Sequence, residues 1–271
     1  MKINKSNTKI ILYIGLLLSF TISNISAKES YMTASVAMVG MSMDYREYNK
    51  AGAILDSEES PYTDITGAEM SFGYVFDKDI SAYSYIKLNL LLLSGETKYV
   101  GSYLGSGQPY GSVVSKTQNT ILDTDVSFVH TNILKNNFEF SYGFGLGYRE
   151  WERALSASQI EVYKWYYLKP IVGVSVMVSD RVKVGANIEY QHGFDTIMTS
   201  SNPKLDFTLG GANIWELSVP ISYVYNKNMD IFFEATFSKQ TIIESNVNSG
   251  YYEPDSTAYN NYLKFGVAFK F

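Results

Sequence analysis

Hydrophobic and polar residues alternate with a period of two along most of this chain. That period is typical of a β-strand whose two faces meet different surroundings. Beyond residue 27 no apolar run is long enough to cross a membrane as a helix. The alternation predicts ten strands, at residues 31–46, 63–76, 80–97, 117–134, 138–155, 163–178, 182–198, 213–226, 230–245 and 260–271.

The segments between these strands differ in length in a regular way. Short polar turns are predicted at 77–79, 135–137, 179–181 and 226–229. Longer links alternate with them, at 47–62, 98–116, 156–162, 199–212 and 246–259. Short turns at one end and long loops at the other are typical of membrane barrels. Because lipid leaves unpaired backbone groups unsatisfied, the prediction is an all-β fold, a single closed antiparallel transmembrane barrel of about ten strands.

The two faces of the predicted strands have different chemistry. In residues 138–149 the even-numbered positions are aromatic or aliphatic, whereas the odd-numbered ones are Glu, Ser, Gly or Arg. We expect the bulky face to meet lipid and the small, charged face to line a narrow interior. A soluble barrel would place its bulky side chains inside, and the period alone does not distinguish these two folds.

The last nine residues carry the clearest signal of location. Leu263, Phe265, Val267, Phe269 and Phe271 share one face of a strand that ends on an aromatic residue. This strand resembles the last strand of Gram-negative outer-membrane β-barrels, and the whole chain resembles the small OmpA-like or porin-like group. The resemblance implies residence in the cell outer membrane. It also implies that Phe265, Val267, Phe269 and Phe271 form the signal that the barrel-assembly machinery recognises.

The N-terminus has the pattern of a secretory signal peptide. Lys2, Lys5 and Lys9 precede a short apolar stretch at 10–22, and small residues allow cleavage after Ala27. An N-terminal membrane anchor is the alternative. The predicted organisation is a signal peptide at 1–27 and an outer-membrane barrel domain at 28–271.

Composition narrows the chemistry. The chain has no cysteine, which excludes disulfides and lipidation at cysteine. Without residues 1–27 it carries 19 basic and 27 acidic side chains, a net charge of −8 that argues against nucleic acid as a partner. No cofactor or metal is expected. Glu253 and Asp255 could join a calcium site, but two acids in a loop are usually solvated.

Hairpin register predicts which charges meet inside the barrel. Symmetric turns would place Glu69 opposite Lys87 and Asp123 opposite Arg149. The full set of inward charged candidates for ion pairs in the lumen is Glu69, Lys87, Asp123, Asp125, Arg149, Lys169, Glu189, Glu216, Glu234 and Lys264. We expect these side chains to fill the lumen. A narrow channel for ions or small solutes is the alternative.

These features predict a structural or surface-interaction protein and no enzyme. Its expected partners are outer-membrane lipid, lipopolysaccharide, the barrel-assembly machinery and an extracellular ligand bound through Tyr-, Gly- and Ser-rich loops. Arg153 is the candidate for contact with lipopolysaccharide phosphates. A hydrolase of the omptin kind needs an Asp–His pair that neither His130 nor His192 forms in the sequence. A lipid A deacylase would have to use His130 with Thr131.

Overall fold

A computed structural model describes residues 30–76, 78–102 and 108–271 of the chain. The predicted signal peptide at 1–27 lies outside the described residues, so the division of the chain at Ala27 stays a prediction. Within the described ranges, no helix is long and apolar enough to cross a membrane.

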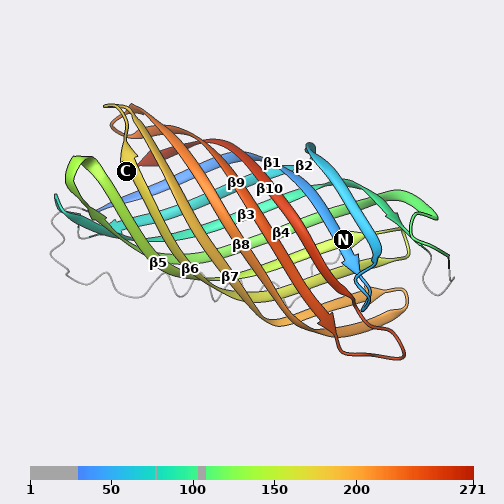
Figure 1. The fold of residues 1–271 in the computed structure, drawn as a ribbon. Coiled ribbons are helices and arrows are strands. Elements are labelled where there is room, and N and C mark those ends of the chain that lie inside the picture. Colours follow the sequence, from blue (N-terminus) through green and yellow to red (C-terminus); the bar gives the residue numbers. More distant parts are fainter. Residues whose placement is uncertain (1–29, 77, 103–107) are drawn as a thin grey trace.

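Ten antiparallel strands close into one barrel, in which each strand pairs with its neighbours in sequence and β1 pairs with β10 (Figure 1). This confirms the predicted fold class and strand number. The strands are β1 (Tyr31–Tyr48), β2 (Ile54–Phe76), β3 (Ala82–Gly101), β4 (Val113–Ile133), β5 (Phe138–Ala154), β6 (Ile160–Met177), β7 (Val182–Ser201), β8 (Lys204–Asn226), β9 (Met229–Ser245) and β10 (Asp255–Lys270). A short 3₁₀ turn, η1 (Lys135–Asn137), joins β4 to β5.

The strands are much longer than a bilayer requires. They run from 16 residues in β10 to 23 in β2 and β8, whereas about 9–11 residues of a tilted strand cross the hydrocarbon. The extra length lies at the end where long loops were predicted. The predicted links at 47–62, 199–212 and 246–259 are wrong in extent, because residues 54–62, 204–212 and 255–259 continue the barrel wall.

The lower part of the barrel, next to the turns after β2, β4, β6 and β8, has its apolar face outside. On β5 the outward side chains Phe140, Tyr142, Phe144 and Leu146 are all exposed. Outward aromatic rings also contact one another at the upper limit of this apolar band, where Tyr190 and Trp215 lie 4.5 Å apart between ring centroids. These contacts form the aromatic girdle expected where hydrocarbon meets head groups. We call this part the membrane half.

Above the girdle the two faces exchange character. On β1 the outward positions change from Val36 and Met38 to Asp44 and Arg46, which pair with each other at 2.9 Å. On β5 the outward positions above Tyr148 are Glu150 and Glu152. A wall with charges outside and apolar residues inside is the arrangement of a soluble barrel. We call this part the upper half.

The interior of the upper half is a packed hydrophobic core. Its largest buried members are Trp151, Trp165, Tyr45, Tyr163 and Tyr167, each no more than 2% exposed. The expectation that sparse, ionised side chains face inward along the whole barrel is therefore correct in the membrane half and wrong above it. The reason is the surrounding solvent: water outside favours apolar residues within.

One strand departs from regular pairing at the boundary between the halves. In β2, pairing with β3 stops at Glu59 and resumes at Ile65, and the β1 ladder also shifts there. The intervening residues form a bulge in the wall. A hollow of about 1410 Å³ lies beside it on strands β1–β4 and β10.

Candidate functional site

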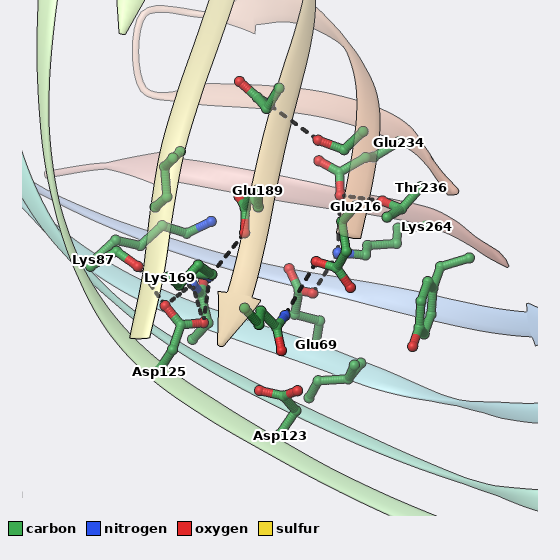
Figure 2. Close-up of a pocket in the computed structure, with 18 of the residues that line it drawn as sticks. Glu69, Lys87, Asp123, Asp125, Lys169, Glu189, Glu216, Glu234, Thr236 and Lys264 are labelled. Atoms are coloured by element: carbon green, nitrogen blue, oxygen red, sulfur yellow. Dashed lines mark hydrogen bonds and ion pairs between the residues drawn. The ribbon is translucent and has the colours of Figure 1, made fainter. Parts of the chain in front are cut away.

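All ten predicted lumen residues line a single cavity of about 200 Å³ in the membrane half (Figure 2). Alternation alone brings them together, because every one of them occupies an inward position on β2 to β10. Lys264 on β10 joins Glu69 at 2.7 Å and Glu234 at 2.9 Å. Figure 2 shows this trio on one side of the cavity.

A second trio centres on Lys169 of β6. Its ammonium group lies 3.1 Å from Asp125 and 3.1 Å from Glu189. Asp125 also accepts hydrogen bonds from Asn89 and from Ser127, at 3.1 Å and 2.6 Å. Each carboxylate in this group has a cationic or polar partner, which offsets the cost of removing it from water.

The predicted pair of Arg149 and Asp123 is present. The two residues lie directly opposite each other, and Arg149 Nη1 donates to Asp123 Oδ2 at 3.1 Å. Tyr167 donates to the other oxygen of Asp123 at 2.5 Å, and Arg149 Nη2 donates to the Tyr262 hydroxyl at 3.2 Å. These two tyrosines form the ceiling of the cavity, where the charged lumen gives way to the apolar core.

The predicted pair of Glu69 and Lys87 is wrong. Glu69 lies opposite Leu91, and Lys87 lies opposite Gly73. The turn is longer than expected, because Asp79 accepts hydrogen bonds from the backbone of Ser81 and Ala82 and delays the start of β3. The error is an even number of residues, so both side chains still face inward.

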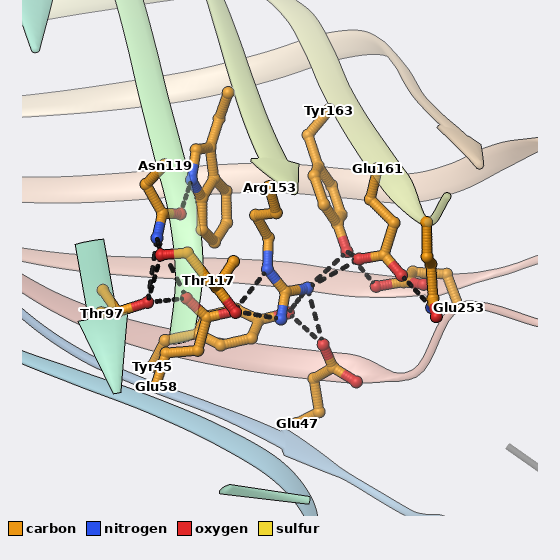
Figure 3. Close-up of polar contacts among 12 residues, drawn as sticks. Tyr45, Glu47, Glu58, Thr97, Thr117, Asn119, Arg153, Glu161, Tyr163 and Glu253 are labelled. Carbon is orange, nitrogen blue, oxygen red and sulfur yellow. Dashed lines mark hydrogen bonds and ion pairs between the residues drawn. The ribbon is translucent and has the colours of Figure 1, made fainter. Parts of the chain in front are cut away.

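A separate polar cluster lies within the core of the upper half and is centred on Arg153 (Figure 3). We call it the Arg153 cage. The guanidinium donates to Glu58 at 2.8 Å, to Glu47 at 2.9 Å and to Glu161 at 3.0 Å. It also lies 4.4 Å from the centroid of the Tyr45 ring, within the range of a cation–π contact.

Hydrogen bonds extend the cage to the neighbouring strands. Glu58 accepts from Thr97 at 2.5 Å and from Asn119 at 3.2 Å. Asn119 in turn accepts from Trp151 Nε1 at 2.8 Å. The indole is thereby fixed within the barrel, next to the guanidinium it covers.

The link between β9 and β10 closes over the cage. Glu253, from this link, is 6% exposed and accepts a hydrogen bond from the Tyr163 hydroxyl. Its backbone is held by Ser245, whose hydroxyl accepts from Glu253 N at 2.8 Å. The expectation that Glu253 is solvated is therefore wrong. Burial raises the pKa of Glu253 well above its ordinary value, and the charges of Glu47 and Glu161 raise it further.

Burial and charge also act on Glu161 and Asp56 at this end of the barrel. Burial raises the pKa of Glu161 to about 7, against the opposing effect of Arg153. Burial and the charge of Glu47 raise the pKa of Asp56 to about 6. Five carboxylates, those of Glu47, Asp56, Glu58, Glu161 and Glu253, therefore surround one guanidinium, and the excess negative charge favours protons on some of them.

The prediction that Arg153 faces the membrane surface is wrong. Its side chain is 1% exposed and satisfied by carboxylates, so it is not positioned to meet lipopolysaccharide phosphates. The error has a plain cause: Arg153 has the parity of Arg149 and Trp151, which are inward residues. The aromatic positions 163, 165 and 167 share the parity of Lys169, and this was the signal in the sequence for a filled upper half.

The two histidines lie on the outer face, as predicted. His130 Nδ1 lies 2.9 Å from the Ser84 hydroxyl near the turn end, and His192 Nδ1 lies 2.9 Å from Asn213. Neither has a carboxylate partner among the described residues. Within those residues no group of three or more acidic or histidine side chains is arranged to hold a metal ion.

The residues of the predicted assembly signal lie on the outer face of β10 and just after it. Phe265 and Phe271 are exposed, at 55% and 73%. Phe269 and Phe271 have ring centroids 6.4 Å apart, and Val267 lies between Phe265 and Phe269 on the same face. Their role in assembly stays a prediction.

No family model matches the sequence, and no curated protein matches it. Among solved structures, the chain is similar to the outer membrane protease OmpT from Escherichia coli, with a TM-score of 0.58 and 11% identity over 93% of this chain and 100% of that one. It also matches the transport unit of the autotransporter AIDA-I from Escherichia coli, with a TM-score of 0.46 and 10% identity over 100% of both chains. The translocator domain of the autotransporter NalP from Neisseria meningitidis matches with a TM-score of 0.45 and 9% identity, over 97% of this chain and 96% of that one.

These similarities concern the fold alone. With the closed ten-stranded wall and its outward apolar band, the likeness to OmpT defines the class of fold: a Gram-negative outer-membrane β-barrel, located in the cell outer membrane. At 11% identity, the likeness to a protease shows the fold and by itself assigns neither an enzymatic nor a non-enzymatic role.

Proposed function

We propose that this barrel is closed to solutes and acts as a structural and surface-interaction protein, with no enzymatic activity. The observation that carries the proposal is the filled interior of the upper half. Trp151, Trp165 and Tyr163 are each no more than 2% exposed, and the Arg153 cage occupies the space beyond them. A solute would have to displace both layers.

Conductance in planar bilayers tests the proposal directly. The wild-type protein is expected to give no steady openings. A variant with Trp151→Ala, Arg153→Ala, Trp165→Ala and Tyr167→Ala is expected to conduct, since it removes the rings and the guanidinium at the centre of the cage. Steady nanosiemens-scale openings of the wild-type barrel would support the alternative of a narrow porin-like channel and end the proposal.

The absence of enzymatic activity is supported by the state of the acidic residues. Asp123 and Asp125 are engaged by Arg149 and Lys169, and the cage carboxylates surround Arg153. Their charges are committed to contacts within the barrel. Incubation of folded protein with a mixed peptide library is expected to yield no cleavage. Cleavage that is lost in Asp123→Asn would establish an omptin-like hydrolase instead.

Lipopolysaccharide is the partner we assign to the hollow beside the β2 bulge. The hollow lies directly above the apolar band, at the height of the head-group sugars. Its walls carry Asp44, Glu59, Asp64 and Glu96, whose oxygens can accept hydrogen bonds from sugar hydroxyls, and the half-exposed ring of Tyr259. Added lipopolysaccharide should raise the melting temperature of the wild type, and it should raise the melting temperature of the Tyr259→Ala variant by less. An equal rise for Tyr251→Ala and Tyr259→Ala would exclude this site.

A further inference from the structure

Two charged side chains that line the cavity in the membrane half, one cationic and one anionic, take no part in its ion pairs. Lys264, Lys169 and Arg149 each bind a carboxylate, and together they engage Glu69, Glu234, Asp125, Glu189 and Asp123. Lys87 and Glu216 also line the cavity. Among the described residues neither forms an ion pair, and the side chain of Glu216 accepts one long hydrogen bond, from Gln191 at 3.4 Å.

Two deeply buried side chains that line this cavity also carry a polar atom without a hydrogen-bond partner among the described residues. Within residues 30–76, 78–102 and 108–271, Arg149 is 2% exposed and its Nε has no hydrogen-bond acceptor, while Gln191 is 4% exposed and its Oε1 has no donor. Buried polar atoms are nearly always paired with protein or with a bound species. An unpaired donor and an unpaired acceptor at one cavity indicate a bound species that offers both an acceptor and a donor.

The barrel places the cationic groups and the anionic group on opposite walls of the cavity. Lys87 lies on β3 and Glu216 on β8, which are five strands apart in a ring of ten and therefore face each other across the lumen. Arg149 on β5 lies on the side of Lys87, and Gln191 on β7 lies beside Glu216. Figure 2 shows Lys87 and Glu216 reaching into the cavity from different walls. Asn89 on β3 adds one more unpaired acceptor oxygen.

Access to the cavity comes from the turn end of the barrel. Tyr167 and Tyr262 close it above, and the apolar core lies beyond them. Below it, a cavity of about 170 Å³ shares Tyr85 and Asn187 with it and continues toward the turns. Because the start of β1, the end of β10 and the short turns lie at this end, the path opens on the periplasmic side.

We propose that this chamber is a periplasm-facing binding site for a small zwitterion of the α-amino acid class. The ligand carboxylate accepts from Lys87 Nζ and from the Arg149 guanidinium, and its ammonium group donates to Glu216 and to the side-chain amide of Gln191. A volume of about 200 Å³ accommodates an amino acid with a small side chain. This site goes beyond the proposed function, since a chamber closed above binds a solute without conducting it.

Calorimetry on the detergent-solubilised full barrel tests the site, with glycine and L-alanine as probes. Both are expected to bind, whereas acetate and methylammonium, which carry only one of the two charges, are expected to bind at least ten-fold more weakly. Lys87→Met and Glu216→Gln should each weaken binding of glycine by about ten-fold or more, because each removes a charged hydrogen bond.

Matched controls separate this site from general effects on the barrel. Lys239→Met and Glu152→Gln make the same chemical changes on the outer face and should leave the affinity for glycine unchanged. Heat-modifiable gel mobility confirms that each variant is folded. The proposal is overturned if glycine does not bind to folded wild-type protein, which would mean a chamber filled by water only. It is also overturned if Lys87→Met and Glu216→Gln bind glycine as tightly as the two controls.

Discussion

Arg153 Nη2 lies 2.8 Å from Glu58 Oε1, and both side chains are no more than 1% exposed. The two residues come from β5 and β2 and meet across the interior of the upper half. A fully buried charge is tolerated only with partners, so this contact and its neighbours make Arg153 the residue on which the local packing depends.

Arg153→Met should lower the free energy of unfolding by about 3–5 kcal/mol, since it leaves several buried carboxylates without a cation. Urea titration of the folded barrel, followed by tryptophan fluorescence, measures this change. Arg181→Met is the control, because Arg181 lies in an exposed turn and, among the described residues, its guanidinium bonds only to Tyr223. Equal stability of the two variants would contradict the role of the cage.

The stability of the upper half should fall as the pH rises through 7. The pKa of Glu161 is about 7 in the folded barrel and near 4.5 in the unfolded chain, so the folded state holds the extra proton between these values. The contribution of this proton to the free energy of unfolding is fully present below about pH 4.5. It is lost as the pH rises through 7, by an amount on the order of 3 kcal/mol. The raised pKa of Glu253 acts in the same direction.

Melting temperatures between pH 5 and pH 9 measure this dependence. Glu161→Gln and Glu253→Gln should each flatten the curve, because a neutral amide has no proton to lose. Glu152→Gln, on the outer face of β5, should not change it. A wild-type melting temperature that rises with pH over this interval would refute the assignment.

Lys264 and Lys87 should differ in their effect on stability although both line the same cavity. Lys264→Met leaves Glu69 and Glu234 without a cation and should cost on the order of 3 kcal/mol. Lys87→Met breaks no ion pair among the described residues and should cost less. Urea titrations of the two variants compare them directly, and an equal loss would show that Lys87 has a structural partner of similar weight.

Gly147→Ala should destabilise the ceiling of the cavity. A Cβ at this position would overlap the Tyr167 ring, whose hydroxyl is held by Asp123. Overpacking of this kind typically costs about 1–3 kcal/mol. In a Tyr167→Ala background the same substitution should cost little, and a double-mutant cycle by thermal unfolding measures the coupling. If the effects of the two substitutions on stability are additive, the destabilisation by Gly147→Ala does not come from overlap with the Tyr167 ring.

Removal of Phe271 should reduce the amount of folded barrel in the outer membrane. Its backbone N–H donates to the Met32 carbonyl at 3.0 Å, but its ring is 73% exposed and adds little to stability. Gel mobility without heating measures the folded fraction in membranes. Purified protein without Phe271 should refold like the wild type, and a refolding defect would point to a structural role instead.

The sequence was sufficient for the strand number, the inward parity and the pair of Asp123 and Arg149. Each of these follows from local alternation and from a symmetric turn. The membership of the lumen set also follows from parity alone, which is why an error in the β2–β3 register moved Lys87 away from Glu69 without changing its face.

The apolar core of the upper half was not predicted, because its strands place apolar residues inside and charged residues outside, the reverse of the membrane half. Residues 54–60 read as a polar loop, yet Glu58 is fully buried by Arg153, which lies 95 positions further along the chain. No local pattern contains that contact. The alternation does continue through Tyr163 and Trp165 and places both residues on the inward face. Because lipid was expected outside along the whole barrel, bulky inward residues were not predicted.

The exchange of faces halfway up the wall has a consequence for how the sequence can change. An inserted residue in a strand would turn membrane-facing side chains inward and send tryptophans into water at the same time. Length changes within the strands are therefore absorbed best where the backbone already departs from regular pairing, as between Glu59 and Ile65. Such irregular points are where comparisons of related chains should place insertions and deletions.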